Sequence, residues 1–184
     1  MILISGSGPQ DRNSEIFGHK SFWVIADYFA KNGIGTFRYD ERGVGKSTGK
    51  HSECDLHDLY KDVQFITKNI RKRKDVKKVG LLGHSEGGII APWYASNCKK
   101  IKFVIMLAAP GVEPKEMMHE QRRLQSELAG NISPLQIKIQ ENMFRKIDST
   151  VLASTNDSVL KIELRKITDA QFYSLKNVET QKNN

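Results

Sequence analysis

The chain of 184 residues has no long hydrophobic run, only two cysteines and an aromatic content of 8%. A membrane-spanning helix needs about 20 consecutive apolar residues, so no membrane partner is expected. The opening residues, Met1 to Ile4, are too short for a signal sequence, and a cytoplasmic location is the default expectation. Cys54 and Cys98 lie in polar surroundings without metal-ligand spacing, so the sequence implies neither a disulfide framework nor a metal site.

Negative charge is the scarcer sign, with 21 Asp and Glu against 29 Lys and Arg and a net charge of +8. The densest basic stretch covers residues 68–74 and is followed by Lys77 and Lys78. It lies where a predicted helix ends before a strand, and cations there complement the helix dipole. No aromatic interleaving or binding motif accompanies it, so no nucleic-acid partner is expected. A basic nucleic-acid-binding module is kept only as a weaker alternative.

Short apolar runs alternate with helical periodicity over the first part of the chain. Strands are predicted at residues 2–4, 34–39, 78–82 and 101–107, with helices over residues 22–29 and 59–70 between them. Strands separated by helices pair in parallel through right-handed crossovers, which predicts an α/β layered fold. The expected four-strand sheet leaves an unpaired edge at residues 101–107, and a second copy could pair with this edge or with the helical lid described below to form a homodimer.

From residue 113 onward the pattern is helical only. Ser133 is placed as an N-cap, Pro134 as the first helical residue and Gln136 as the partner of a capping box. Three amphipathic helices that follow a strand end directly predict a lid over the carboxyl ends of the strands, where ligands bind in open α/β sheets. Ordinary core packing is the alternative. The expected division is a core over residues 1–112 and a helical lid over residues 113–184.

Residues 79–91 have the pattern of a buried strand that turns abruptly at Ser85 and enters a helix. A Gly-x-Ser-x-Gly match alone is a weak signal, but the apolar run before it and the small residues after it are what a nucleophile elbow requires. Gly83 and Gly87 leave room where the strand and helix backbones nearly touch, and His84 completes the strand end. The helix N-terminus favours negative charge beside the serine. Ser85 is therefore the predicted nucleophile.

Four stretches together resemble the α/β-hydrolase superfamily, in the serine hydrolase branch with esterases, thioesterases and prolyl-peptidase-like enzymes. They are residues 4–12, 39–47, 80–88 and 107–112, one at each strand end and in the order of the family. Residues 43–47 also look like part of a phosphate-binding loop, but Asp40 stands where that loop needs glycine. The resemblance implies a partial α/β-hydrolase parallel sheet with flanking helices and a C-terminal helical lid segment.

The same resemblance implies a chemistry. The N–H groups of Ser7 and Glu86 would form the oxyanion hole, and Ser85 would cleave a carboxylic ester, thioester or peptide-like bond through an acyl-serine intermediate. The partners would be small-molecule esters, thioesters or short peptides, with no cofactor and no metal. Ser5 stands where the family often has histidine, a change that leaves backbone donation intact.

The acid and the histidine of a catalytic triad are not found. In this family they follow the serine on loops after later strands, yet only His119 follows Ser85, and it lies in the predicted lid. His84 is expected to project away from its neighbour, and the remaining histidines are expected to be solvated or at helix starts: His19, His51 and His57. The expectation is a fragment or truncated gene product. The alternative is a catalytically inactive remnant, or a binding or oligomerisation domain, that retains the hydrolase scaffold.

Overall fold

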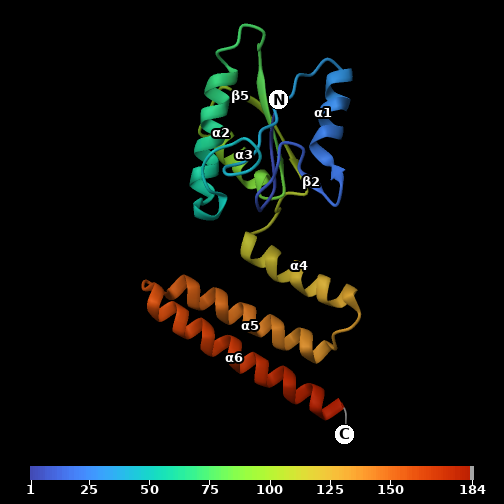
Figure 1. The fold of residues 1–184 in the computed structure, drawn as a ribbon, viewed down its shortest axis with the longest axis vertical. Helices are drawn as coiled ribbons and strands as arrows, with labels where there is room; N and C mark the ends of the chain where they lie inside the picture. The colour runs from blue at the N-terminus through green and yellow to red at the C-terminus, as the bar shows by residue number, and fades with distance from the viewer. Residues whose placement is uncertain (183–184) are drawn as a thin grey trace. The chain divides into compact units, whose positions relative to one another are not determined.

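The computed structural model describes residues 1–182, which separate into two compact units. Unit 1 is Met1–Gly111, and unit 2 begins at Val112. Unit 1 contains the parallel sheet and the helices that flank it, and unit 2 is built from helices (Figure 1). None of the described helices is long and apolar enough to cross a membrane.

The main sheet has three parallel strands in the order β1-β4-β5, so it is assembled through crossovers, as the alternating pattern predicts. The strands are β1 (Ile2–Ile4), β4 (Val79–His84) and β5 (Ile101–Leu107). Leu3 lies opposite Leu82, and Gly83 lies opposite Met106. Strand β5 forms one edge of this sheet, and its Phe103 side chain is about half exposed. The α/β fold class is confirmed.

Alternate side chains of β1 point to opposite faces of the sheet, as the two-residue period of a strand requires. Ile2 and Ile4 pack with α2 (Leu56–Ile70) and α3 (Gly87–Ser96), whereas Leu3 packs with α1 (Ser21–Lys31). Figure 1 shows α1 on one side of the sheet and α2 with α3 on the other. Both faces of β1 are therefore buried, which explains why its sequence is a continuous apolar run.

The strand predicted at residues 34–39 is wrong in extent. The structure pairs this segment with β1 at one residue only, an isolated parallel bridge between Ile2 and Phe37. Two hydrogen bonds hold the bridge: Leu3 N–H donates to the Phe37 carbonyl at 3.0 Å, and Phe37 N–H donates to the Met1 carbonyl at 2.8 Å. Beyond it, Arg38 binds the side chain of Asn13. Pairing stops there because β1 is short and the next residues hydrogen-bond to loops instead.

A short antiparallel hairpin precedes α1, and the sequence pattern did not reveal it. Its strands are β2 (Glu15–Ile16) and β3 (His19–Lys20). Phe17 and Gly18 form the turn with φ values of 52° and 82°. Two consecutive left-handed residues fit a two-residue hairpin turn, and Gly18 is the one residue there that could have indicated such a turn from the sequence.

The ends of the helices follow local capping chemistry. Asp55 precedes α2 and accepts a hydrogen bond from Asp58 N–H at 3.0 Å, within a capping box, as its N-cap position predicts. A one-turn helix, η1 (His51–Glu53), stands just before it. In unit 2 the helices are α4 (Pro114–Ala129), α5 (Pro134–Ala153) and α6 (Asp157–Lys182). Ser133 caps α5 in the predicted capping box with Gln136.

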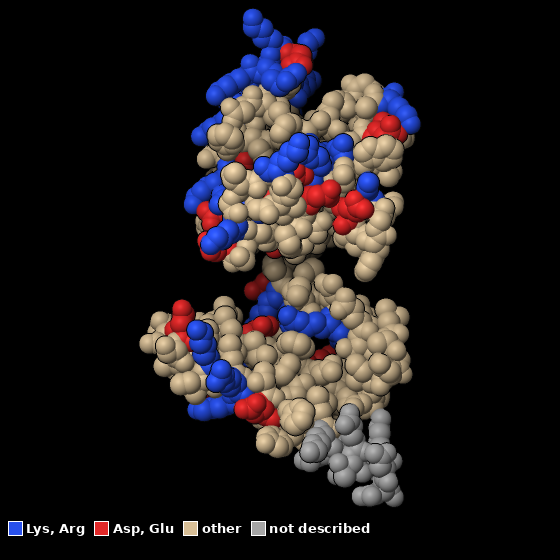
Figure 2. All heavy atoms as spheres, in the orientation of Figure 1, with Lys and Arg blue, Asp and Glu red and all other residues tan. Residues whose placement is uncertain are grey.

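Basic side chains gather at one end of unit 1 (Figure 2). Strands β4 and β5 begin at this end, and their first residues, Val79 and Ile101, are paired with each other. Ser85 follows the other end of β4. The candidate active site and the basic end therefore lie at opposite ends of the strand. Five basic residues line a hollow of about 210 Å³ at the basic end: Arg71, Lys77, Lys78, Lys100 and Lys102.

Candidate active site

Ser85 forms the turn between β4 and α3 and has a φ of 52°. This left-handed conformation is rare for a residue with a side chain and costs of the order of 1 kcal/mol or more, so it persists only where the surroundings fix it. The Ser85 N–H donates to the carbonyl of Leu107 at the end of β5, at 2.9 Å, and Gly88 N–H donates to the Ser85 carbonyl at 2.9 Å. The side chain is only partly buried. The turn thus presents a hydroxyl at the carboxyl end of the sheet.

The glycines on both sides of this turn are required by close backbone contacts. A Cβ at Gly83 would lie 2.1 Å from the carbonyl oxygen of Gly87, and a Cβ at Gly87 would lie 2.3 Å from the carbonyl oxygen of Ile4. Real Cβ atoms essentially never approach closer than 3.0 Å. Any larger residue at either position would therefore push the helix start away from the strands.

The loop after β1, residues 5–10, lies against the Ser85 turn; it is called the oxyanion loop below because it contains Ser7, the expected oxyanion donor. A Cβ built on Gly6 would stand 3.1 Å from Ser85 Cβ and 3.3 Å from His84 Nδ1. The Ser7 hydroxyl donates to Glu86 Oε2 at 3.2 Å and so joins this loop to the residue after Ser85. Among the described residues, no acceptor engages the backbone N–H of Ser7 or of Glu86. The structure thus brings both predicted oxyanion donors beside the predicted nucleophile.

Two ion pairs fix the loop that follows the Phe37 bridge. The Asp40 carboxylate, 6% exposed, accepts hydrogen bonds from the Arg12 guanidinium at 2.6 and 2.9 Å. These bonds hold the pKa of Asp40 well below its ordinary value, because they favour the charged form. Arg42 binds Asp62 of α2 at 2.6 and 2.9 Å. Asp40 and Arg42 therefore anchor loops, the structural role that their motif position suggests.

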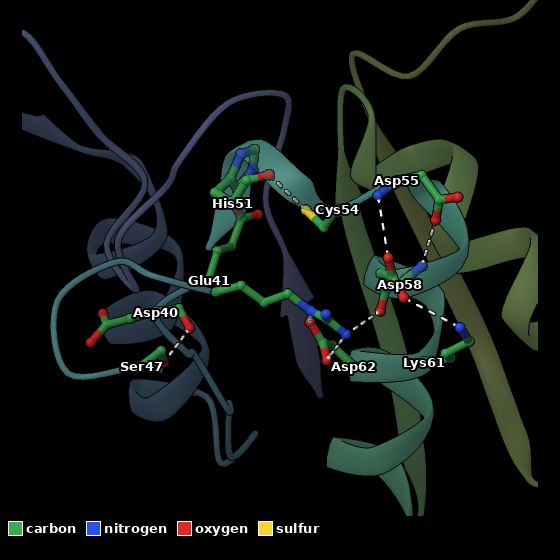
Figure 3. Close-up of polar contacts among 10 residues, drawn as sticks. Asp40, Glu41, Ser47, His51, Cys54, Asp55, Asp58, Lys61 and Asp62 are labelled. Atoms are coloured by element: carbon green, nitrogen blue, oxygen red, sulfur yellow. Dashed lines mark hydrogen bonds and ion pairs between the residues drawn. The ribbon is translucent and has the colours of Figure 1, made fainter. Parts of the chain in front are cut away.

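Glu41, between those two residues, was missed by sequence reasoning. Its side chain is 5% exposed and accepts the Ser5 hydroxyl at 2.5 Å and the Gln10 N–H at 3.1 Å. His51 Nε2 lies 3.3 Å from Glu41 Oε2 but is not aligned as a hydrogen bond. Figure 3 shows the two side chains close together. Burial raises the pKa of Glu41, and the hydrogen bonds from Ser5 and Gln10 oppose this shift. The only sequence signal was its place inside the Asp-x-Arg-Gly motif.

The histidines do not complete a triad in this structure. Among the described residues, none of them hydrogen-bonds to the Ser85 hydroxyl. His119, the histidine that follows Ser85 in the sequence, is 5% exposed in unit 2, with Nε2 2.9 Å from Asp148 Oδ2. His51 is at a helix start, as the first residue of η1, and its side chain lies near Glu41. His57 is largely exposed and stacks edge-on against Trp93.

The parallel sheet, the strained serine turn and the glycine contacts define an α/β-hydrolase. The family model described as serine aminopeptidase, S33, matches residues 20–170. The chain belongs to this family of the α/β-hydrolase superfamily.

Two curated relatives share part of their length with this chain. The esterase EstD of Thermotoga maritima is 32% identical over 148 residues, which cover 79% of this chain and 35% of the esterase. Protein phosphatase methylesterase 1 of Candida albicans is 29% identical over 76 residues, 41% of this chain and 21% of the relative. The chain thus spans about a third or less of the length of these relatives.

Solved structures agree with this fold assignment. Est1E from Butyrivibrio proteoclasticus, determined with ferulic acid bound, has a TM-score of 0.51 and 23% identity, covering 67% of this chain and 45% of its own. The α/β-hydrolase GrgF from Penicillium sp. sh18 has a TM-score of 0.51 and 19% identity, covering 84% and 60%. At these identities the likeness concerns the fold alone.

Proposed function

We propose that this protein is a serine hydrolase that cleaves a carboxylic ester through an acyl intermediate on Ser85. The observation that carries the proposal is the φ of 52° at Ser85, which sits between a strand end and a helix start with the oxyanion loop against it. Backbone strain of this kind is maintained at functional sites. EstD and the methylesterase are esterases by name, which favours esters over thioesters or peptides as the substrate class.

In the proposed reaction the Ser85 oxygen attacks the ester carbonyl carbon, and a base takes the hydroxyl proton. The carbonyl electron pair moves onto oxygen, where the N–H groups of Ser7 and Glu86 donate to it. Collapse of this intermediate breaks the bond to the leaving alcohol, which receives the proton. Water then attacks the acyl-serine and releases the acid. The dipole at the start of α3 favours the negative charge in both steps.

Labelling with a fluorophosphonate probe tests this proposal directly. The probe phosphonylates a serine only when the hydroxyl is activated, so the full chain should gain one adduct, mapped to Ser85 by mass spectrometry. The Ser85→Ala variant should gain none. Ser96→Ala is a matched control, since Ser96 lies at the other end of α3 and its hydroxyl donates to Trp93. A folded wild-type chain without an adduct would contradict the proposal.

A second candidate function is binding without catalysis. It is favoured by the absence of a histidine hydrogen-bonded to Ser85 in the described part of the chain. Two hollows of unit 1, of about 430 and 210 Å³, are lined by neither Ser85 nor the oxyanion loop. An unlabelled but stably folded protein would favour this function over hydrolysis.

We also propose that residues 113–184 act as a lid that selects substrates. Helix α4 exposes apolar side chains, among them Leu124 and, at 86% exposure, Leu128. An apolar lid surface favours long acyl chains, so wild-type protein should react faster with long-chain than with short-chain fluorophosphonates. Leu128→Asp should reduce this preference, whereas an unchanged preference would count against the lid.

Pairing of two copies through β5 is a separate proposal. Strand β5 is an edge strand of the described sheet, and unpaired edges favour association with another chain. Sedimentation should then detect a dimer that Val104→Pro disrupts, since proline removes a backbone donor from the strand. A monomer at high concentration would refute this proposal.

A further inference from the structure

The buried carboxylate of Glu41 hydrogen-bonds to both ends of the oxyanion loop. Glu41 Oε1 accepts the hydroxyl of Ser5, the first residue of the loop, at 2.5 Å, and Oε2 accepts the N–H of Gln10, the last residue, at 3.1 Å. The Glu41 N–H in turn donates to the Gln10 carbonyl at 3.1 Å. One residue therefore makes three hydrogen bonds to the two ends of a six-residue loop.

The same loop is held against the serine turn at its middle. Gly6 lies close to Ser85, and the Ser7 hydroxyl donates to Glu86 at 3.2 Å. The Ser7–Glu86 bond is exposed, so it is weak on its own. The Ser5–Glu41 bond is buried and the Gln10–Glu41 bond is part-buried, and both are stronger, because hydrogen bonds to a charged group gain strength away from water. The position of the Ser7 N–H relative to Ser85 thus depends chiefly on Glu41.

Glu41 is also a titratable member of this network. Burial raises its pKa, and the nearby Glu86 carboxylate adds to the shift. The Ser5 hydroxyl, the Gln10 N–H and His51 oppose it. Tyr39 is a further titratable group beside Glu41. Protonation would remove an acceptor from the loop, so the loop should loosen as the pH falls.

We infer that Glu41 is a positioning residue for the oxyanion hole: its carboxylate fixes residues 5–10 so that the Ser7 N–H points at the oxygen of a substrate attacked by Ser85. This inference rests on the proposed hydrolase function. It assigns Glu41 no contact with the substrate, since its oxygens are occupied by Ser5 and Gln10.

The test combines amide hydrogen exchange with fluorophosphonate labelling of the full chain. Glu41→Leu removes both acceptors, and the Gln10 amide should then exchange at least about tenfold faster. Glu41→Gln should give an intermediate rate, because the amide keeps one acceptor but loses the charge. Ser5→Ala removes a single contact to Glu41 and replaces Glu41→Leu as the test variant if Glu41→Leu fails to fold. The Ser85 amide, bonded to Leu107, should be unchanged.

The rate of Ser85 labelling should fall in the same order, by at least about tenfold in Glu41→Leu. The rate of wild-type labelling should also fall as the pH is lowered and Glu41 is protonated. Glu41→Gln should lack this part of the pH dependence, which a purely structural role would not produce. Glu53→Gln is the matched control, since Glu53 is exposed and forms an ion pair with Lys50.

The outcomes separate the two proposals. Unchanged Gln10 exchange in the Glu41 variants overturns the inference, and so does faster exchange with equal labelling rates. A wild-type chain that gains no adduct overturns the hydrolase function. In that case the exchange rates alone still decide whether Glu41 fixes the loop.

Discussion

Replacement of Gly83 by alanine tests the contact on which the serine turn depends. The added Cβ would lie 2.1 Å from the Gly87 oxygen, 2.4 Å from the Gly87 carbonyl carbon and 2.7 Å from the Gly88 nitrogen. All three are backbone atoms, so no flexible side chain can move aside. To reach a separation of 3.0 Å, β4 and the start of α3 must move apart by about 0.9 Å.

The energetic cost follows from where this movement occurs. Overpacking in a well-packed core costs about 1–3 kcal/mol, and the cost here should lie at the upper end, about 3 kcal/mol, because both partners are rigid backbone. The neighbouring Gly87 is itself packed against the Ile4 carbonyl, so a shift of α3 disturbs β1 as well. With a urea dependence of about 2 kcal/mol per molar, the unfolding midpoint should fall by about 1.5 M.

Urea unfolding followed by circular dichroism measures this change, with Gly35→Ala as the control. Gly35 has no heavy atom within 4 Å of a built Cβ and no positive φ. Its alanine variant should be as stable as wild type, or up to about 1 kcal/mol more stable. Equal midpoints for Gly83→Ala and Gly35→Ala would refute the reasoning that backbone contact selects glycine at the turn.

Three further predictions concern strain, charge and capping. Ser85→Gly should raise the free energy of unfolding, measured in urea, by about 0.5–1 kcal/mol, because glycine accepts the left-handed φ. The same variant should lose all fluorophosphonate labelling. Asp40→Asn should cost about 2 kcal/mol at neutral pH by weakening the bonds to Arg12. Since the pKa of Asp40 is lowered in the folded chain, this stabilisation is full above the ordinary value of 3.8 and disappears as the pH falls below it. The urea midpoints of wild type and Asp40→Asn should therefore converge in acid. Asp75→Asn is the control: Asp75 forms an exposed pair with Arg73, so its loss should leave the midpoint unchanged. Ser133→Ala should cost about 1 kcal/mol of stability in unit 2, measured by the loss of helicity in urea, through loss of the cap on α5.

Those parts of the fold that depend on local chemistry could be predicted from the sequence. Strand β5 begins and ends at the predicted residues, Ile101 and Leu107, because an apolar β-branched run lies between two turns. The caps at Asp55 and Ser133 were predicted because side-chain capping needs only neighbours in the sequence. Glycine spacing around Ser85 predicted a turn, and the structure has one, with a left-handed φ at Ser85.

Parts that depend on distant partners could not be predicted. Residues 34–39 have strand-like composition, but the length of a strand depends on its neighbour, and β1 offers only three residues. The sequence did not reveal the contacts of Glu41, because its partners, Ser5 and Gln10, are more than 30 positions earlier in the chain. Burial of a carboxylate is a property of the assembled loops, which a local pattern does not contain.

The strain at Ser85 is one half of a paired arrangement at the carboxyl end of the sheet. Ala108, which follows β5, also has a left-handed φ, of 45°, and its neighbour Ala109 faces Gly88 at the start of α3. The hydrogen bond from Ser85 N–H to the Leu107 carbonyl ties the two strained turns together one residue beyond β4. Each turn alone could relax by extending its strand. Because the bond and the glycine contacts fix both at once, relaxation of either turn would break packing at the other, and this mutual constraint keeps the Ser85 hydroxyl at the strand end.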